Sequence, residues 1–174
     1  MRLKTLMLKF DANSFFGDKS KRHSNKEMLE PSEHISFGEP ITKVTLGVIG
    51  KREDISKVDL HEKIVNPLLK ALGEMPDKIL LPNEGTSSAL LSIWAERTEI
   101  PADQIAADWQ RYNRMSFKIR DGRIVKDSSI LLLFQGPKSE YLPKLGVREV
   151  KKGKRVFVVT PGKEWKLEEW TKED

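Results

Sequence analysis

Four consecutive residues, Gly85-Thr86-Ser87-Ser88, could bind a phosphate group. They follow a short apolar run at residues 78–81 and open an amphipathic stretch, which predicts that they begin a helix. A glycine lets the backbone come close to a ligand, and the unpaired N–H groups at a helix N-terminus favour an anion. Serine and threonine also cap helices that bind nothing, so both interpretations stay open. The P-loop skeleton G-x-x-x-x-G-K-[ST] is absent, so nothing supports ATP hydrolysis.

Further polar residues stand where two other apolar runs end. Gly50-Lys51-Arg52 follows residues 43–49, and Gln135-Gly136 follows residues 130–134. If these runs are parallel strands, their carboxyl ends meet at one edge of the sheet, where ligands bind in open α/β folds. Lys51 and Arg52 could pair there with a phosphate, although a solvated loop explains them equally well. The candidate ligand-binding residues are Gly50, Lys51, Arg52, Gly85, Thr86, Ser87, Ser88, Arg120, Gln135 and Gly136.

A basic cluster with interleaved aromatic side chains occupies residues 111–123. Its members are Arg111, Tyr112, Arg114, Phe117, Lys118, Arg120 and Arg123. Cations alternating with aromatic rings could stack on a nucleobase and hold a phosphate. A solvated helix face explains the same pattern equally well, so the cluster alone does not decide the function.

Three carboxylates are candidates for acid–base catalysis. Asp108 and Asp121 are expected nearest the cleft, where either could accept a hydrogen bond from a ribose hydroxyl or act as a base. Glu84 is the third candidate, although no fixed spacing pairs any of these carboxylates. The three histidines are scattered and there is no cysteine. The sequence therefore predicts no metal site, no cofactor, no thiolate chemistry and no Ser–His–Asp triad.

Apolar runs alternate with amphipathic stretches between residues 43 and 159. The runs predict strands at residues 43–49, 78–81, 104–107, 130–134 and 156–159. The amphipathic stretches predict helices at residues 56–72, 86–97 and 142–152. Strands that alternate with helices are joined by right-handed crossovers into a parallel sheet. We therefore expect an α/β fold, a Rossmann-like three-layer sandwich with a mostly parallel sheet.

Some of these elements carry more detailed expectations. In the first helix Ser56 is expected at the start, Gly73 at the stop and a kink at Pro67. Residues 110–126 are expected to form a loop and a short helix. The core-facing residues expected in the second helix are Ala89, Leu90, Ile93 and Trp94.

The basic charge is concentrated near the N-terminus. The formal net charge is +5, and residues 1–26 contain seven Lys or Arg residues against two Asp residues, so the remainder is neutral. We expect an irregular basic arm over residues 1–42 with a short strand at residues 3–10, then a nucleotide-binding domain over residues 43–162. Residues 163–174 are expected to form a tail that docks through Trp165 and Trp170 or frays. Nucleic-acid binding through the arm is an alternative that the neutral remainder disfavours.

The composition indicates a globular chain. Hydrophobic residues make up 38% and charged residues 33% of the sequence, which is polar without being typical of disorder. No run approaches the roughly 18 uncharged apolar residues of a membrane helix, and the first residues do not form a secretory signal. A cytoplasmic location is expected, because there is no cysteine for a disulfide. Assembly into a homo-oligomer stays open.

Short motifs follow one another along residues 43–160. They are Gly50-Lys51-Arg52, Gly85-Thr86-Ser87-Ser88-Ala89, Ala107-Asp108-Trp109-Gln110-Arg111-Tyr112, Ile119-Arg120-Asp121, residues 130–136 and residues 153–158. Their order resembles the SLOG superfamily, the Rossmann-like set that includes LOG-type nucleotide phosphoribohydrolases and DprA/Smf proteins. Within that set, the resemblance is to its small bacterial and phage branch.

The resemblance implies binding of nucleotides or nucleotide-derived signals, with cleavage of an N-glycosidic bond in some members. Two departures bear on this activity. Ser87 stands where the branch usually has Asp, and Ala89 stands where the LOG-type enzymes have a Glu. A phosphate cradle survives these losses, whereas that catalytic carboxylate does not. We therefore expect binding or sensing of a nucleotide-derived molecule, with N-glycosidic hydrolysis as the alternative.

Overall fold

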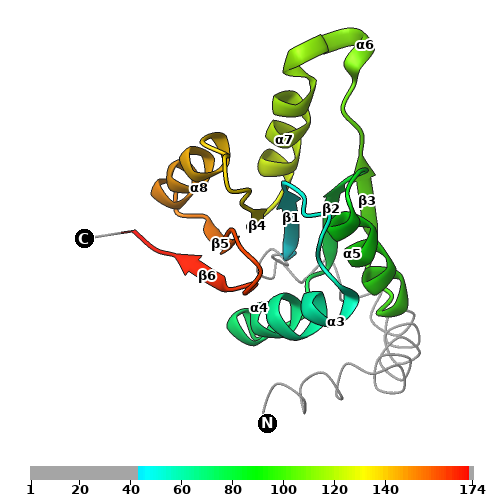
Figure 1. The fold of residues 1–174 in the computed structure, drawn as a ribbon, viewed down its shortest axis with the longest axis vertical. Helices are drawn as coiled ribbons and strands as arrows, with labels where there is room; N and C mark the ends of the chain where they lie inside the picture. Colours follow the sequence, from blue (N-terminus) through cyan, green and yellow to red (C-terminus); the bar gives the residue numbers. More distant parts are fainter. Residues whose placement is uncertain (1–42, 173–174) are drawn as a thin grey trace, which may run out of the picture. The chain divides into compact units, whose positions relative to one another are not determined.

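Residues 43–172 are described by the computed structural model, and their centre is a six-stranded sheet (Figure 1). The strands are β1 (Thr45–Ile49), β2 (Lys78–Pro82), β3 (Ala102–Ile105), β4 (Ile130–Phe134), β5 (Arg155–Val159) and β6 (Leu167–Trp170). Their order in the sheet is β3-β2-β1-β4-β5-β6. The first five strands pair in parallel, and β6 runs antiparallel to β5. The basic arm and its strand at residues 3–10 lie outside the described residues.

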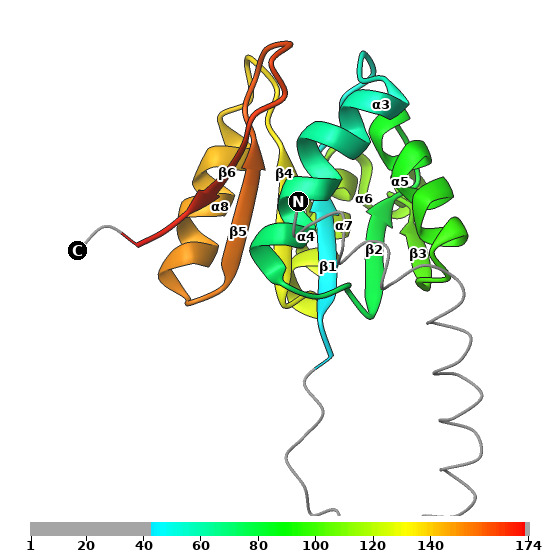
Figure 2. The ribbon, with the colours of Figure 1, turned by 90° about the horizontal axis from the view of Figure 1, so that it is seen from below.

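Helices cover both faces of this sheet. They are α3 (Lys57–Asp59), the π-helical turn η1 (Leu60–Val65), α4 (Asn66–Leu72), α5 (Thr86–Arg97), α6 (Trp109–Tyr112), the 3₁₀ turn η2 (Asn113–Met115), α7 (Ser116–Asp127) and α8 (Tyr141–Lys151). The helices α3, α4 and α5 lie on one face, and α7 and α8 lie on the other (Figures 1 and 2). The structure confirms the Rossmann-like three-layer sandwich. None of the described helices is long and apolar enough to cross a membrane.

The central strands β1 and β4 form the core of the sheet. All five residues of β4 are buried, as are the last four of β1. Burial on both faces explains why these strands read as continuous apolar runs. The third strand is different, because it lies at the edge and its residues are half-buried or exposed. It begins at Ala102, two residues before the predicted start, because its alternation of apolar and polar residues is too weak to fix its bounds.

The first helical stretch has the predicted start and stop, but its interior is not a regular α-helix. Ser56 accepts a hydrogen bond from the Asp59 N–H at its start, and Gly73 adopts the left-handed conformation at its end. The disturbance expected at Pro67 takes the form of a π-helical turn, which finishes just before the turn that holds this proline. A π turn shifts the hydrogen bonding by one residue, and proline, which has no N–H to donate, is tolerated in the first turn of a helix.

The helix α5 has the predicted bounds, but the predicted core face is wrong in part. Trp94 is buried as expected, whereas Ala89 and Ile93 are exposed and Leu90 is only half-buried. The residues that face the core are Ser87, Ser88, Leu91, Trp94 and Ala95. Two serines on the buried face make the apolar periodicity misleading, because the pattern counts them as solvent-facing.

Two further differences concern the second half of the chain. Residues 116–127 form a full helix, α7, where a loop and a short helix were expected. The run at residues 156–159 is not the last strand, because β6 follows it. Trp165 is buried, and Trp170 packs on α8 at Gly146, where an added Cβ would lie 2.8 Å from the indole Cζ3. Glycine weakens a helix interior, and at Gly146 the missing side chain makes room for Trp170.

We expect Gly47→Ala to lower the free energy of unfolding by about 1–3 kcal/mol, the usual cost of overpacking a core. A Cβ at Gly47, in the middle of β1, would lie 2.6 Å from Ser128 Oγ and 2.9 Å from Ile124 Cγ2. Gly122→Ala is the matched control, because no atom lies within 4 Å of its added Cβ on α7. Urea denaturation should show the control unchanged or stabilised. Equal stability of both variants would contradict the tight packing of α7 on β1.

Candidate functional site

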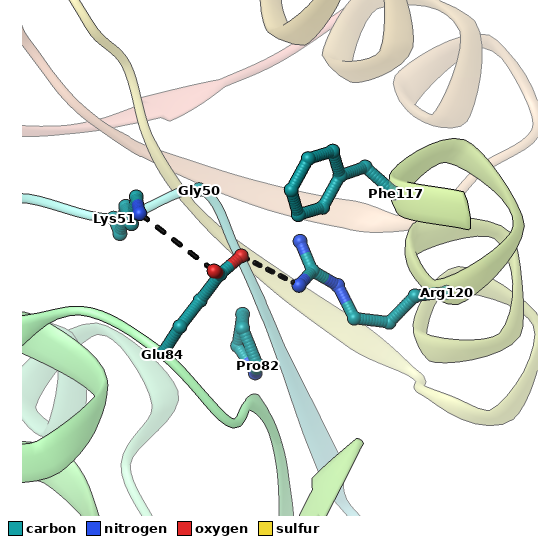
Figure 3. Close-up of a pocket in the computed structure, with 6 residues that line it drawn as sticks. All are labelled: Gly50, Lys51, Pro82, Glu84, Phe117 and Arg120. Atoms are coloured by element: carbon teal, nitrogen blue, oxygen red, sulfur yellow. Dashed lines mark hydrogen bonds and ion pairs between the residues drawn. The ribbon is translucent and has the colours of Figure 1, made fainter. Parts of the chain in front are cut away.

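A pocket of about 340 Å³ opens at the carboxyl ends of β1 and β2 (Figure 3). Its lining residues are Gly50, Lys51, Pro82, Glu84, Phe117 and Arg120. The first two follow β1, the next two end and follow β2, and the last two come from α7. The volume lies within the range of small-molecule sites, and the position is where open α/β sheets bind ligands. Of the predicted ligand-binding residues, the pocket brings together Gly50, Lys51 and Arg120.

A carboxylate held by two cations occupies the middle of this pocket. Glu84 Oε1 lies 2.8 Å from Arg120 Nη1, and Glu84 Oε2 lies 3.7 Å from Lys51 Nζ. The Arg120 side chain is buried at 6% exposure, whereas that of Lys51 is 48% exposed. Figure 3 shows the lysine and the guanidinium on opposite sides of the carboxylate. Lys51 is thus the cation that a ligand can reach without opening the buried network.

The buried guanidinium continues the network away from the pocket. Arg120 Nε donates to Asp121 Oδ1 at 3.3 Å, and the guanidinium carbon lies 5.0 Å from the centre of the Phe117 ring. Burial raises the pKa of Asp121 above its ordinary value, and the positive charge of Arg120 opposes this rise. The pKa of Tyr141 is raised as well, first by burial and then by the charge of Asp121. A buried carboxyl with a raised pKa is typical of acid–base sites and also of structural ion pairs.

Two glycines allow the loops around the pocket to approach each other. Gly85 has φ +93°, and an added Cβ would lie 2.6 Å from Lys51 Cβ. Gly50 has φ +83°, and an added Cβ would lie 2.5 Å from the Phe134 carbonyl oxygen at the end of β4. Both positions combine a left-handed backbone with a close contact, so only glycine fits without strain. Lys51 therefore depends on Gly85 for its place beside Glu84.

The N-terminus of α5, the predicted phosphate cradle, is bonded to the loop after β1. The Glu53 carboxylate accepts from Thr86 Oγ1 at 2.8 Å and from the Thr86 N–H at 3.2 Å. Ser87 is fully buried, and its Oγ accepts from the Arg52 N–H while its N–H donates to the Arg52 carbonyl. The pKa of Glu53 is lowered, mainly by the Thr86 hydroxyl. A phosphate at this helix terminus would have to displace the Glu53 carboxylate.

Ser88 and Arg52, two other predicted ligand-binding residues, do not line the pocket. Ser88 is buried, and its Oγ makes no hydrogen bond within residues 43–172. The Arg52 guanidinium stacks on Trp165, 4.4 Å from the ring centre, and Nη2 donates to the Gly162 carbonyl at 3.1 Å. Arg52 thus ties the loop after β1 to the loop after β5, and its side chain is 11% exposed.

The remaining candidates lie outside the pocket lining. Asp108 is exposed and caps α6, where its Oδ1 accepts from the Arg111 N–H. The Gln135 N–H donates to the Val159 carbonyl, and the Gly136 carbonyl accepts from the Ser139 N–H. These contacts bind the loop after β4 to its surroundings, and none of them joins the network around Glu84.

The basic cluster at residues 111–123 divides between the pocket and solvent. Arg120 and Phe117 line the pocket, whereas Arg111 is exposed and lies over the Tyr112 ring at 5.3 Å. Trp109, not among the predicted site residues, is 51% exposed and meets the Phe117 ring edge-on at 4.7 Å. Pro82 and Glu53 were also missed. Glu53 stood in the sequence beside Lys51 and Arg52, but its partner Thr86 is 33 residues away.

Within residues 43–172, no group of three or more His, Cys, Asp or Glu side chains is placed to hold a metal ion. Comparisons with protein-family models, with curated proteins and with solved structures found no match to this chain. The pocket and the residues that line it are therefore the features that bear on function.

We expect Asp121→Asn to raise the free energy of unfolding at neutral pH. Folding raises the pKa of Asp121 above its ordinary value of 3.8, so the folded state holds the proton more tightly. Stability is then lost as pH rises from that ordinary value through the raised one, so the ionised carboxyl costs stability above the raised pKa. Urea denaturation should show the gain at neutral pH, and the gain should shrink toward about pH 3.5. A variant less stable at neutral pH would show that the attraction to Arg120 outweighs burial.

Proposed function

We propose that the chain binds a nucleotide or a nucleotide-derived small molecule in the pocket beside Glu84. One observation carries this proposal: the lining combines an accessible cation, a fixed carboxylate and an apolar wall. Lys51 supplies the cation, Glu84 the carboxylate, and Phe117 and Pro82 the wall. A nucleotide has an anionic, a hydroxyl-bearing and a flat aromatic part, so each part meets a group of matching chemistry.

The phosphate belongs with Lys51 in this proposal. Arg120 is already engaged by Glu84 and by Asp121, and its buried position leaves it little freedom to turn toward a ligand. Lys51 lies about half exposed at the mouth, where a phosphate could approach it through water. The N-terminus of α5 can add to phosphate binding only if Glu53 moves away, because that carboxylate takes the Thr86 donors.

The position of the pocket and the resemblance both support binding. The sheet order changes direction at β1, between β2 on one side and β4 on the other, and ligands of open α/β folds bind at such a point. Membership of the SLOG superfamily, which the motif order suggests, would make a nucleotide-derived ligand the expected one. Nucleic-acid binding through residues 1–26 stays an alternative that lies outside the described residues.

A second candidate function, cleavage of an N-glycosidic bond, is favoured by the buried Asp121. It shares one guanidinium with Glu84, so a carboxyl with a raised pKa and a carboxylate lie on either side of Arg120. A buried carboxyl with a raised pKa is suited to hold and donate a proton in acid–base catalysis. Asp121 does not line the pocket, so we rank binding first. Release of free base from nucleotides, lost in Asp121→Asn, would establish the hydrolase.

Thermal unfolding of the full chain across a panel of nucleoside mono-, di- and triphosphates, dinucleotides and cyclic nucleotides tests the proposal. A ligand at 100 times its dissociation constant stabilises by about 2.7 kcal/mol, which raises the melting temperature by several degrees for a domain of this size. We expect such a shift with at least one member. No shift with any member would overturn the proposal.

A further inference from the structure

We propose that Glu84 binds the ribose hydroxyls of the ligand, so that the pocket selects ribonucleotides over 2′-deoxyribonucleotides. The inference rests on the proposed function and names the part of the ligand that this carboxylate binds. Glu84 is the one carboxylate among the six lining residues and lies at the centre of the cluster that they form.

The Glu84 carboxylate is held through Oε1 before any ligand arrives, whereas Oε2 has a cation nearby but outside hydrogen-bond distance. Oε1 accepts from Arg120 at 2.8 Å, and Oε2 lies 3.7 Å from Lys51 Nζ on the other side. An ionised carboxylate has about four lone-pair sites, so each oxygen retains one for a further donor. Because Arg120 is itself buried and held by Asp121, Glu84 is oriented by a rigid partner. A preorganised acceptor pair of this kind suits two neighbouring hydroxyl donors.

The surroundings decide which part of a nucleotide can meet this carboxylate. A phosphate brings only acceptors and negative charge, so Glu84 would repel it, whereas Lys51 attracts it. Phe117 offers an apolar ring for the base at the opposite side of Glu84 from Lys51 (Figure 3). The order of lysine, carboxylate and ring matches the order of phosphate, sugar and base. A ribose supplies two adjacent O–H donors at the middle position whichever base is attached.

The test is isothermal titration of the full chain with AMP, GMP, CMP and UMP and with their 2′-deoxy counterparts. A hydrogen bond to a charged group contributes about 1.5–3 kcal/mol, so we expect each deoxy ligand to bind about ten- to a hundredfold more weakly than the ribonucleotide. In Glu84→Gln a neutral acceptor replaces the charged one, and such bonds are about half as strong. The preference should then fall to about three- to tenfold. Glu62→Gln, an exposed residue of η1, is the matched control and should keep the full preference.

Each outcome separates this inference from the proposed function. Equal affinity for ribo- and deoxyribonucleotides in the wild-type chain would overturn the role of Glu84 and leave nucleotide binding intact. A preference for guanine that ignores the sugar would also overturn it, because Glu84 would then read the edge of the base. If none of the four ribonucleoside monophosphates binds, the inference is overturned, whereas the proposed function is overturned only if the wider nucleotide panel also gives no thermal shift. The wild-type comparison stands even if Glu84→Gln does not fold.

Discussion

Lys51→Met is expected to weaken nucleotide binding about ten- to a hundredfold while leaving the fold intact. The substitution removes the one lining cation that is well exposed, and with it a charge-assisted hydrogen bond to phosphate of about 1.5–3 kcal/mol. Methionine retains a stem that can pack on Gly85, where the Lys51 side chain lies. Isothermal titration with whichever nucleotide stabilises the wild-type chain measures the loss.

Lys126→Met is the matched control for this prediction, because Lys126 is an exposed lysine in the last turn of α7 and does not line the pocket. It lowers the net charge by the same amount. If the two variants lose affinity equally, general electrostatic attraction explains the binding rather than a phosphate at Lys51. Unchanged affinity in Lys51→Met would place the phosphate elsewhere, and the N-terminus of α5 would be the next candidate.

Arg120→Met is expected to lower the free energy of unfolding by about 3–5 kcal/mol at neutral pH. Its guanidinium is nearly inaccessible and pairs with both Glu84 and Asp121, so its removal leaves Asp121 buried without its cation. The cost should shrink at acidic pH, because burial already raises the pKa of Asp121 and a proton can replace the lost charge. Urea denaturation at several pH values measures both effects.

A double substitution isolates the cause of that loss. Adding Asp121→Asn to Arg120→Met removes the unpaired carboxylate and should restore part of the stability. Arg123→Met, an exposed position on the same helix, should cost little and serves as the control for losing an arginine. If Asp121→Asn restores nothing, lost packing against Phe117 explains the effect instead of an unpaired buried charge.

The sheet, and the edge of it that carries the pocket, could be predicted because both depend on local sequence patterns. The apolar runs that form β1, β2, β4 and β5 locate the strands, and parallel strands bring their carboxyl ends together wherever the helices lie. That argument correctly expected Gly50 and Lys51 at one edge. Asp108 and Asp121 were expected nearest the cleft, but it is Glu84 that lines the pocket. The same patterns placed β3 two residues too late and did not predict β6, because edge strands bury too little surface to need an apolar run.

The surroundings of the predicted site residues were not predictable, because they depend on contacts between distant segments. Whether Thr86 and Ser87 face a ligand or the chain itself depends on the loop after β1, which supplies Glu53 and the Arg52 backbone. The direction of the Arg52 side chain depends on Trp165, which lies 113 positions later in the chain. No pattern within a single segment contains this information. Nucleotide binding, the SLOG resemblance and the roles of the site residues stay predictions.

The most direct test of the account is to map the binding surface by NMR on the full, ¹⁵N-labelled chain titrated with AMP, GMP, CMP and UMP. We predict saturable shifts of the backbone amides of Lys51, Glu84 and Phe117 with at least one of these nucleotides, at similar midpoints for all three. Shifts confined to residues 1–42 or to the exposed Trp109 segment, or no shifts at saturating concentration, would contradict the assignment of this pocket as the nucleotide site.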